Sequence, residues 1–325
     1  MWVTDMPFRT AVKPLNGYRG LVDHSRPVLL VGSCFTDNVG AMLMRDLFDA
    51  EVNPVGPLYN PLSIERFLAM ATGELPATPR ICGTEGAVHS FDAHSRLTGR
   101  TASDTDASLH EALSRTRVAL AHASAVMITL GTTRVFTLRD DGLVVANCHK
   151  EPAGRFEERN LSVEDTEDAL DHIVRMIKGA SPEAVVVFTV SPLRYPGRDT
   201  HDNTMVKSTL HVAVGRILAR YPDDTIYFPS YEIMMDDLRD YRFYADDMRH
   251  PSDRAVEYIY GIFGQSFFTD PTMETALRAR RLTRRLSHRV SHASSPTDDI
   301  HSLPEADILR QSPALERALQ RFLNQ

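Results

Sequence analysis

Short, continuous apolar runs along the chain predict strands that are buried on both faces. The clearest runs are 27–31, 125–130 and 184–190, and none shows the alternation of polar and apolar residues that marks a half-exposed strand. Shorter runs over 50–53 and 225–228 predict two further strands. Strands of this kind are typical of a central parallel sheet.

Segments with apolar residues at helical spacing lie between these runs. Ser162 begins one of them, with Asp165 three residues later as in a capping box, and Ser252 is the expected cap of the last. Because strands and helices alternate, we predict a flavodoxin-like three-layer α/β fold, in which helices cover both faces of a parallel sheet. The predicted helices cover residues 36–48, 62–71, 106–121, 162–179, 206–220 and 252–268.

Two segments interrupt the alternation. Residues 74–100 are rich in Pro, Gly and His, and we expect them to be irregular. Asp141-Gly142 separates two β-rich runs, 135–138 and 143–146, and this arrangement predicts a β-hairpin.

The character of the chain changes near residue 270. A basic helix is expected over 273–290, a linker rich in Ser, Asp and Pro over 291–304, and a short final helix over 313–323. We therefore expect one hydrolase-like domain over 1–270, followed by a C-terminal helical extension over 271–325.

The basic helix allows two interpretations. Its leucines can pack on the domain while its arginines face solvent, which is the interpretation we favour. Alternatively, the arginines bind an anionic partner or a membrane surface. The leucines are Leu277, Leu282 and Leu286, and the arginines are Arg278, Arg280, Arg281, Arg284, Arg285 and Arg289.

Composition limits the classes of protein to which the chain can belong. The formal net charge of −7 makes a nucleic-acid-binding protein an unfavourable interpretation. Three cysteines give no disulfide framework and suit a reducing compartment. No secretory signal and no run of about 18 apolar residues is visible, so we expect a cytoplasmic protein without a transmembrane segment.

Polar and small residues follow the predicted strands, at the edge where parallel sheets bind ligands. Ser33 follows the first strand, and Asp247 and His250 stand three residues apart in a loop that could reach the same edge. A serine hydroxyl needs a base, and that base needs a partner that fixes its tautomer. We therefore predict Ser33 as the nucleophile, His250 as the base and Asp247 as the residue that orients it.

Each half of this constellation has a plainer interpretation. Ser33 alone could be a small turn residue that caps the next helix, and Asp247 and His250 alone could belong to a solvated loop. Cys34 is expected to be a small buried residue whose side chain points away from the site. No cofactor or metal is expected, because the Cys and His residues near 82–94 and 148–149 lack metal-ligand spacing. Asp92, His94 and His149 are candidates to line the substrate pocket.

The sequence Gly32-Ser33-Cys34-Phe35 resembles the motif that gives the GSCFA family its name. The resemblance extends over about residues 8–268, and Thr36 stands where the family has alanine. The family itself resembles a branch of the SGNH/GDSL-type hydrolases. Further matching segments are 53–61, 90–92, 130–132, 145–150, 189–192 and 228–232 through 250–252.

The SGNH pattern implies roles for particular residues. It implies that the N–H of Ser33 and the N–H of Gly56 lie in the oxyanion hole, with Asp247 and His250 as the terminal Asp-x-x-His. The third block of that pattern normally supplies an Asn side chain, but here it reads Gly131-Thr132-Thr133-Arg134. We expect Thr132 or Asn147 to substitute, because loss of one oxyanion donor costs about a hundredfold or more in rate.

The resemblance and the residues together predict a serine-dependent hydrolase of carboxylic esters. The expected substrate is a small-molecule or carbohydrate ester from which a small acyl group is removed. An acyltransferase on the same site is one alternative, because a second alcohol can replace water as the acceptor. A non-catalytic binding module that retains the fold is the other, since the Asn of the third block is missing.

Overall fold

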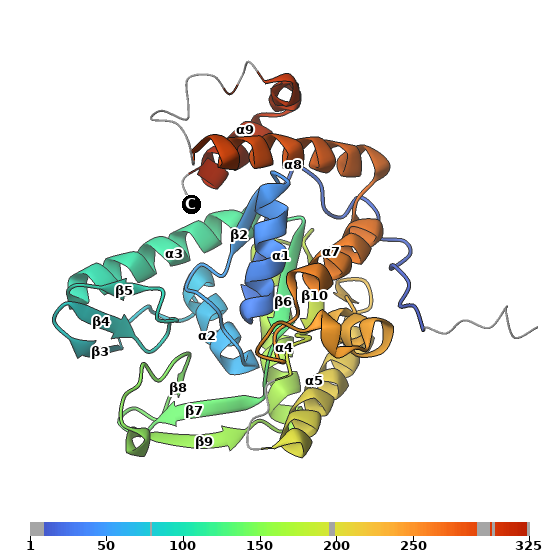
Figure 1. The fold of residues 1–325 in the computed structure, drawn as a ribbon. Helices are drawn as coiled ribbons and strands as arrows, with labels where there is room; N and C mark the ends of the chain where they lie inside the picture. Colours follow the sequence, from blue (N-terminus) through green and yellow to red (C-terminus); the bar gives the residue numbers. More distant parts are fainter. Residues whose placement is uncertain (1–9, 79, 195–198, 291–299, 301–302, 324–325) are drawn as a thin grey trace, which may run out of the picture.

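A five-stranded parallel sheet forms the centre of the molecule (Figure 1). The computed structural model describes residues 10–78, 80–194, 199–290, 300 and 303–323. The strand order is β11-β10-β6-β1-β2, which is the flavodoxin-like order, so the α/β prediction is confirmed. The strands are β1 (Val28–Gly32), β2 (Ala50–Val52), β6 (Ala125–Leu130), β10 (Val185–Val190) and β11 (Thr225–Tyr227).

Helices cover both faces of this sheet, and the alternation of side chains along each strand divides the core in two. In β1, Leu29 and Val31 join the core under α2, α3, α4 and α5, whereas Val28 and Leu30 join the core under α1 and α7. No helix within the described ranges is long and apolar enough to cross a membrane. The bounds are α1 (Cys34–Arg45), α2 (Pro61–Thr72), α3 (Ala102–His122), α4 (Val163–Ala180), α5 (Thr200–Arg220) and α7 (Asp253–Phe267).

The predicted helix caps are formed. Ser162 Oγ accepts a hydrogen bond from the N–H of Asp165 (2.9 Å), and the Asp165 carboxylate accepts one from the N–H of Ser162 (3.1 Å). Ser252 Oγ accepts a hydrogen bond from the N–H of Ala255 (3.4 Å) and begins α7. These two caps fix where α4 and the helix after the Asp247 loop begin.

Two small antiparallel sheets flank the domain (left and lower left in Figure 1). The predicted hairpin is confirmed, because β7 pairs with β8 in an antiparallel register. Residues 74–100 are not irregular throughout, since they contain β3, β4 and β5. The strands are β3 (Ile81–Thr84), β4 (Ala87–Ser90), β5 (Thr98–Gly99), β7 (Arg134–Leu138), β8 (Val144–Val145) and β9 (Phe156–Asn160).

The C-terminal segment packs against α1 rather than extending into solvent. Leu282 and Leu286 are buried in a separate cluster with Leu47 of the domain, as expected, whereas Leu277 is 46% exposed. The expected linker over 291–304 lies mostly outside the described residues. The remaining elements are η2 (Ala153–Arg155), α6 (Ser230–Glu232), η3 (Ile233–Leu238), η4 (Tyr241–Phe243), α8 (Asp270–Val290), η6 (Pro304–Gln311) and α9 (Pro313–Leu323).

Arginines of α8 form ion pairs within the protein. Arg278 pairs with Asp307, and Arg285 pairs with Glu305 (2.9 Å). Arg280 pairs with Asp46, just beyond the end of α1. Three of the five arginines of this cluster whose side chains the structure describes therefore have carboxylate partners, which favours packing over the interpretation as an anion-binding face.

The pair of Arg280 and Asp46 joins the extension to the domain. The Asp46 side chain is 0% exposed and accepts hydrogen bonds from Arg280 Nε (2.8 Å) and from the Tyr260 hydroxyl (3.0 Å). In Figure 1, α8 runs across the end of α1 where this contact lies. Arg45 Nε, at 3.4 Å from Asp46 Oδ1, is a second and more distant cation, so the buried carboxylate depends mainly on Arg280.

We expect Arg280→Ala to lower the free energy of unfolding by about 3 kcal/mol, because the substitution leaves the Asp46 carboxylate buried without its main cation. Urea denaturation followed by circular dichroism measures this change. Arg278→Ala is the matched control, and its exposed pair predicts a loss below about 1 kcal/mol. An equal loss of unfolding free energy in both variants would contradict the role of Arg280 as the main cation beside the buried Asp46.

Candidate active site

The turn after β1 lies against the neighbouring strand β6. Gly32 has φ +151°, and a Cβ added there would lie 2.3 Å from the carbonyl oxygen of Thr129. Asn53 holds the turn from the other side, because its Oδ1 accepts a hydrogen bond from the Gly32 N–H (2.9 Å) and its Nδ2 donates to Asp37 Oδ1 (2.7 Å). Only glycine fits this approach, so contact between backbones dictates the glycine that precedes Ser33.

Ser33 is enclosed at this turn. Ser33 is 0% exposed, and a Cβ added at Gly131 would lie 3.3 Å from Ser33 Cβ. Its Oγ forms no hydrogen bond with any described residue. Its backbone N–H donates to the carbonyl oxygen of Thr129 (3.1 Å). The predicted nucleophile therefore lies beside the end of β6 with an unpartnered hydroxyl.

Asp247 and His250 form a preorganised pair. Asp247 Oδ2 lies 2.5 Å from His250 Nδ1, and Asp247 Oδ1 accepts hydrogen bonds from the N–H groups of Arg249 (2.9 Å) and His250 (3.0 Å). These hydrogen bonds, above all that from the His250 N–H, hold the pKa of Asp247 well below its usual range. The carboxylate is thus charged at neutral pH and directs His250 Nδ1, which leaves Nε2 for proton transfer.

The loop that carries this pair is closed on itself. Tyr244 and Pro251 form an antiparallel bridge, and the N–H of Ala245 donates to the carbonyl oxygen of His250 (2.8 Å). Asp247 and His250 are both about half exposed. No hydrogen bond joins His250 to Ser33, so the two halves of the predicted triad are formed but unpaired in this structure.

The predicted backbone oxyanion donors are engaged within the protein. The N–H of Ser33 is bound to β6, and the N–H of Gly56 donates to the carbonyl oxygen of Asn53 (2.7 Å). Gly56 packs closely under His94, because a Cβ added at Gly56 would lie 2.5 Å from His94 Cβ. Neither N–H reaches a substrate oxygen unless its hydrogen bond is released or shared.

The two expected substitutes for the missing Asn accept hydrogen bonds within their own turns. The N–H of Thr132 donates to the carbonyl oxygen of Tyr59 (2.9 Å), and Thr132 Oγ1 accepts a hydrogen bond from the N–H of Arg134 (3.0 Å). Asn147 Oδ1 accepts a hydrogen bond from the N–H of His149 (2.8 Å). Both side chains stabilise their own turns.

The three candidate pocket residues serve mainly to hold loops. Asp92 is buried and pairs with Arg66 (2.7 Å) and Arg80 (2.6 Å), so its carboxylate is occupied. His149 Nε2 bonds to the carbonyl oxygen of Ser90 (2.7 Å). Burial lowers the pKa of both His94 and His149, which keeps them neutral. None of the three lines the cavity that lies beside the Asp247 loop.

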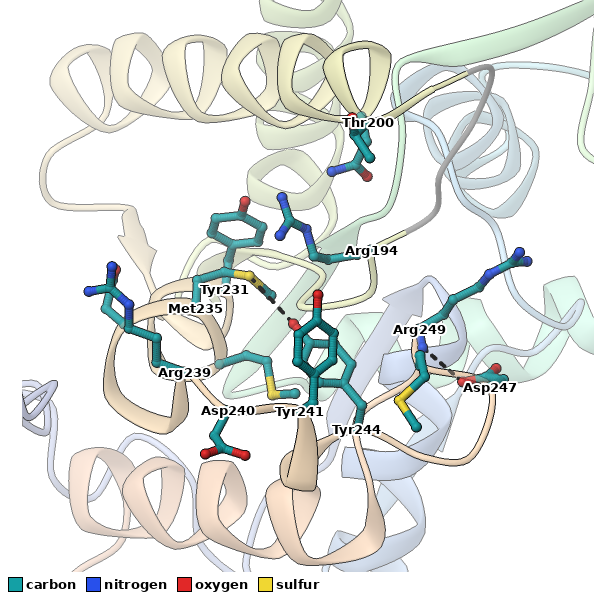
Figure 2. Close-up of a pocket in the computed structure, with 14 residues that line it drawn as sticks. Arg194, Thr200, Tyr231, Met235, Arg239, Asp240, Tyr241, Tyr244, Asp247 and Arg249 are labelled. Carbon is teal, nitrogen blue, oxygen red and sulfur yellow. Dashed lines mark hydrogen bonds between the residues drawn. The ribbon is translucent and has the colours of Figure 1, made fainter.

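That cavity, of about 740 Å³, lies between the start of α5, the η3 turn and the Asp247 loop. Figure 2 shows Asp247 and Arg249 at one end and Tyr231 and Arg239 at the other. Arg194 follows β10 and projects between them. The cavity thus connects the carboxyl edge of the sheet with the loop that carries the predicted base. The shape of this cavity could not be predicted from the sequence, because loops enclose it.

Lys207 was not among the predicted site residues. Its Nζ donates to the carbonyl oxygens of Gly131 and Ser191, each at 2.9 Å, and lies 6.0 Å from the centre of the Tyr231 ring. The residue is 3% exposed, and burial lowers its pKa from 10.5 to about 7. A cation in this position binds the ends of β6 and β10, and one of its two acceptor residues, Gly131, also lies against the Ser33 side chain.

One signal in the sequence could have identified Lys207. It shares a helical face with Leu210, Val214 and Ile217, which are all buried. A lysine on an otherwise apolar face is either extended to the surface or buried for a reason.

Cys34 is half buried at the first turn of α1, rather than fully buried as expected. Burial raises the pKa of its thiol, so the neutral form predominates at neutral pH. Among the described residues, no group of three or more His, Cys, Asp or Glu side chains could hold a metal ion.

Comparisons with known proteins identify a family. The model of the family described as "GSCFA family" matches residues 27–263 of this chain. A comparison with curated proteins found no match.

The chain is also similar to solved structures of esterases. One is a carbohydrate esterase family 3 protein from Talaromyces cellulolyticus, at 8% identity and a TM-score of 0.38, covering 74% of this chain and 95% of that chain. Another is a carbohydrate esterase family 2 enzyme with a carbohydrate binding domain from Corynascus thermopiles (Myceliophthora fergusii), at 13% identity and a TM-score of 0.39; the match covers 81% of this chain and 68% of that chain. A third is an acetyl xylan esterase from the rumen bacterium Butyrivibrio proteoclasticus, at 11% identity and a TM-score of 0.33; the match covers 82% of this chain and 64% of that chain. At these values the likeness carries no information on the chemistry of this chain.

We expect the buried Lys207 to make stability depend on pH. Between about pH 7 and pH 10.5 the unfolded chain holds a proton on this lysine that the folded chain has lost, so the free energy of unfolding rises with pH across that window. Lys207→Met should flatten this rise, as measured by urea denaturation at pH 7, 8 and 9. Lys178→Met removes a partly exposed lysine near the opposite end of β10 and should leave the slope unchanged. Parallel slopes in the wild type and Lys207→Met would contradict a buried, titrating lysine.

Proposed function

This chain belongs to the GSCFA family, and on that premise we propose that it is a serine-dependent hydrolase of carboxylic esters. The observation that carries the proposal is the contact of 2.5 Å between Asp247 and His250, on a loop that lines a large cavity at the carboxyl edge of the sheet. A histidine held by a charged carboxylate, with its second ring nitrogen open, is the arrangement that general-base catalysis requires.

The proposed reaction has two steps. Ser33 Oγ forms a bond to the ester carbonyl carbon as its proton moves to His250 Nε2, and the carbonyl π electrons move to the oxygen. When this oxyanion collapses, the bond to the alcohol breaks, and the leaving alkoxide takes the proton from His250. Water then attacks the acyl-enzyme in the same way, and its proton returns through His250 to Ser33 as the carboxylic acid leaves.

The proposal requires the base to approach the nucleophile. The loop over 244–251 is closed by its own hydrogen bonds, so it moves as one unit over the turn after β1 when substrate binds. Catalytic hydrogen bonds are often absent before substrate binds, so the unpaired arrangement is compatible with this step.

The lining of the cavity favours a carbohydrate or a similar polyhydroxyl alcohol as the substrate. Tyr231, Tyr241 and Tyr244 offer aromatic faces on which a sugar ring can stack, and Arg194 and Arg249 offer donors for hydroxyl groups. We propose that the cavity holds the alcohol part of the ester while the acyl group lies at the turn after β1.

Acyl transfer is the second candidate function. A cavity of about 740 Å³ can hold an acceptor alcohol beside the acyl-enzyme. If that alcohol displaces water, the same residues carry out transfer rather than hydrolysis. Product analysis with a sugar acceptor distinguishes the two outcomes.

We also propose that the chain acts in a reducing compartment such as the cytoplasm. Its three cysteines are all free, and two of them, Cys34 and Cys148, are half buried rather than enclosed. Thiols in such positions persist best where disulfides are not formed.

We expect a fluorophosphonate probe to label the wild-type chain at Ser33 and to leave Ser33→Ala unlabelled. Cys34→Ala, at the neighbouring position, should be labelled as the wild type is. His250→Ala should be labelled at least about a hundredfold more slowly, because the hydroxyl loses its base. Gel fluorescence and mass spectrometry of the modified peptide measure all three.

Two results would count against this proposal. Labelling of Ser33→Ala at the wild-type rate would exclude Ser33 as the nucleophile. Absence of labelling and of p-nitrophenyl acetate hydrolysis in the folded wild type would favour a binding module that retains the fold.

A further inference from the structure

The proposed reaction needs a donor for the oxyanion, and each of the expected residues already takes part in a hydrogen bond elsewhere in the protein. Thr132 Oγ1 and Asn147 Oδ1 accept hydrogen bonds from backbone N–H groups of their own turns, which orients both side chains toward those turns. The N–H groups of Ser33 and Gly56 are bound to carbonyl oxygens. Another polar group at this edge of the sheet is therefore needed to donate a hydrogen bond to the oxyanion as its negative charge develops.

We propose that Lys207 is the side-chain donor of the oxyanion hole. The proposal rests on the proposed function, since it assigns a residue to the same site. It replaces the amide side chain of the usual third block with an ammonium group, which comes from α5 instead of from the loop after β6.

The position of Lys207 supports this role. Its two hydrogen bonds, to the carbonyl oxygens of Gly131 and Ser191, hold Nζ at the point where β6 and β10 end. Gly131 is also the residue against which the Ser33 side chain lies. The ammonium and the hydroxyl therefore approach the same glycine. Because both carbonyls belong to the ends of core strands, Nζ is fixed before substrate arrives.

The charge of Lys207 lacks a counterion. The two carbonyls use two of the three N–H bonds of the ammonium, and no third acceptor for it is found among the described residues. An isolated buried cation is costly, and burial, with a smaller contribution from the charge of Arg194, lowers its pKa to about 7. The site thus favours the arrival of a negative charge beside it.

The neighbours of Lys207 do not supply that charge. The titratable groups around it are Cys34 of α1, Arg194 after β10, His211 of α5 itself and Tyr231 of α6. Burial keeps the thiol of Cys34 and the phenol of Tyr231 neutral by raising the pKa of each. Arg194 is itself cationic. The carboxylate of Glu232 accepts hydrogen bonds from the Tyr227 hydroxyl (2.8 and 3.0 Å) and lies 3.7 Å from His211.

An oxyanion that forms next to Nζ would change this balance. In the ground state the ester carbonyl carries little charge, so Lys207 gains little from it. In the tetrahedral intermediate the oxygen carries a full negative charge and stabilises the protonated lysine. The interaction is therefore stronger in the transition state than in the ground state, which is the condition for catalysis.

Lys207 could act instead as a general base, since a neutral amine would donate its two N–H bonds to the same carbonyls and leave its lone pair open. The pair of His250 and Asp247 already supplies a base, which favours the donor role. The two roles also predict opposite dependence on pH. A donor must be protonated, so activity falls when Lys207 loses its proton, whereas a base must be neutral, so activity rises.

The first test is kinetic and uses p-nitrophenyl acetate. We expect Lys207→Met to lower kcat by about 10²- to 10³-fold with little change in KM. In the wild type, kcat/KM should fall as the pH rises above about 7, and in Lys207→Arg this limb should move to higher pH because arginine stays charged. Lys178→Met is the matched control, because Lys178 also donates to a carbonyl next to β10, that of Ala184, and should leave kcat unchanged.

The second test does not require activity. The sequence contains only four lysines, Lys13, Lys150, Lys178 and Lys207, so lysines labelled with ¹³C at Cε give resolvable NMR signals. At pH 8 we expect sodium acetate, but not sodium chloride at the same ionic strength, to shift the Lys207 signal toward that of a protonated amine. The signal is assigned by its loss in Lys207→Met, and circular dichroism establishes that this variant is folded.

The outcomes separate this inference from the proposed function. A folded Lys207→Met with kcat within threefold of the wild type would overturn the donor role. A wild-type kcat/KM that rises above pH 7, together with loss of this rise in Lys207→Arg, would overturn it as well. An inactive, unlabelled wild type would instead overturn the hydrolase proposal. In that case the acetate titration decides whether Lys207 is an anion site, and an unmoved signal would reject it.

Discussion

The close approach of β1 to β6 at Gly32 is the constraint on which the rest of the molecule depends. Without a side chain at Gly32, the backbone reaches the carbonyl of Thr129, and the chain can then turn into α1 directly beside β6. Asn53 closes the turn from the opposite side. In a sheet of this order, the crossovers diverge between these two strands, which is where a cleft forms. The site is therefore a product of backbone contact before any side chain contributes.

Two kinds of polar group complete the edge of the sheet. Some cap strand ends, as Ser230 does when it donates to the carbonyl oxygen of Val190 (2.8 Å). Others, such as Lys207 and the pair of Asp247 and His250, carry or direct charge. The charged groups come from elements that follow different strands, and only the parallel sheet brings them to one side. The cavity between them is lined by loops, so its shape and lining residues are the part of the molecule that can vary most between related sequences.

The sequence predicted the sheet well, because strands buried on both faces must be apolar throughout. It failed for β4, which has only four residues, and for β9, which is exposed over four of its five residues, because such strands carry little apolar signal. Among site residues, the motif brought attention to Ser33, Asp247 and His250. It could not reveal that backbone N–H groups are engaged, since their partners depend on how closely distant segments approach. Lys207 was passed over because lysines on helices are usually exposed.

The position of α1 has a mechanical consequence. The helix carries the Ser33 turn at one end and meets Asp46, held by Arg280 of α8, at the other. Twelve residues of α-helix span about 18 Å. The contact with α8 thus anchors the far end of the helix that begins at the Ser33 turn.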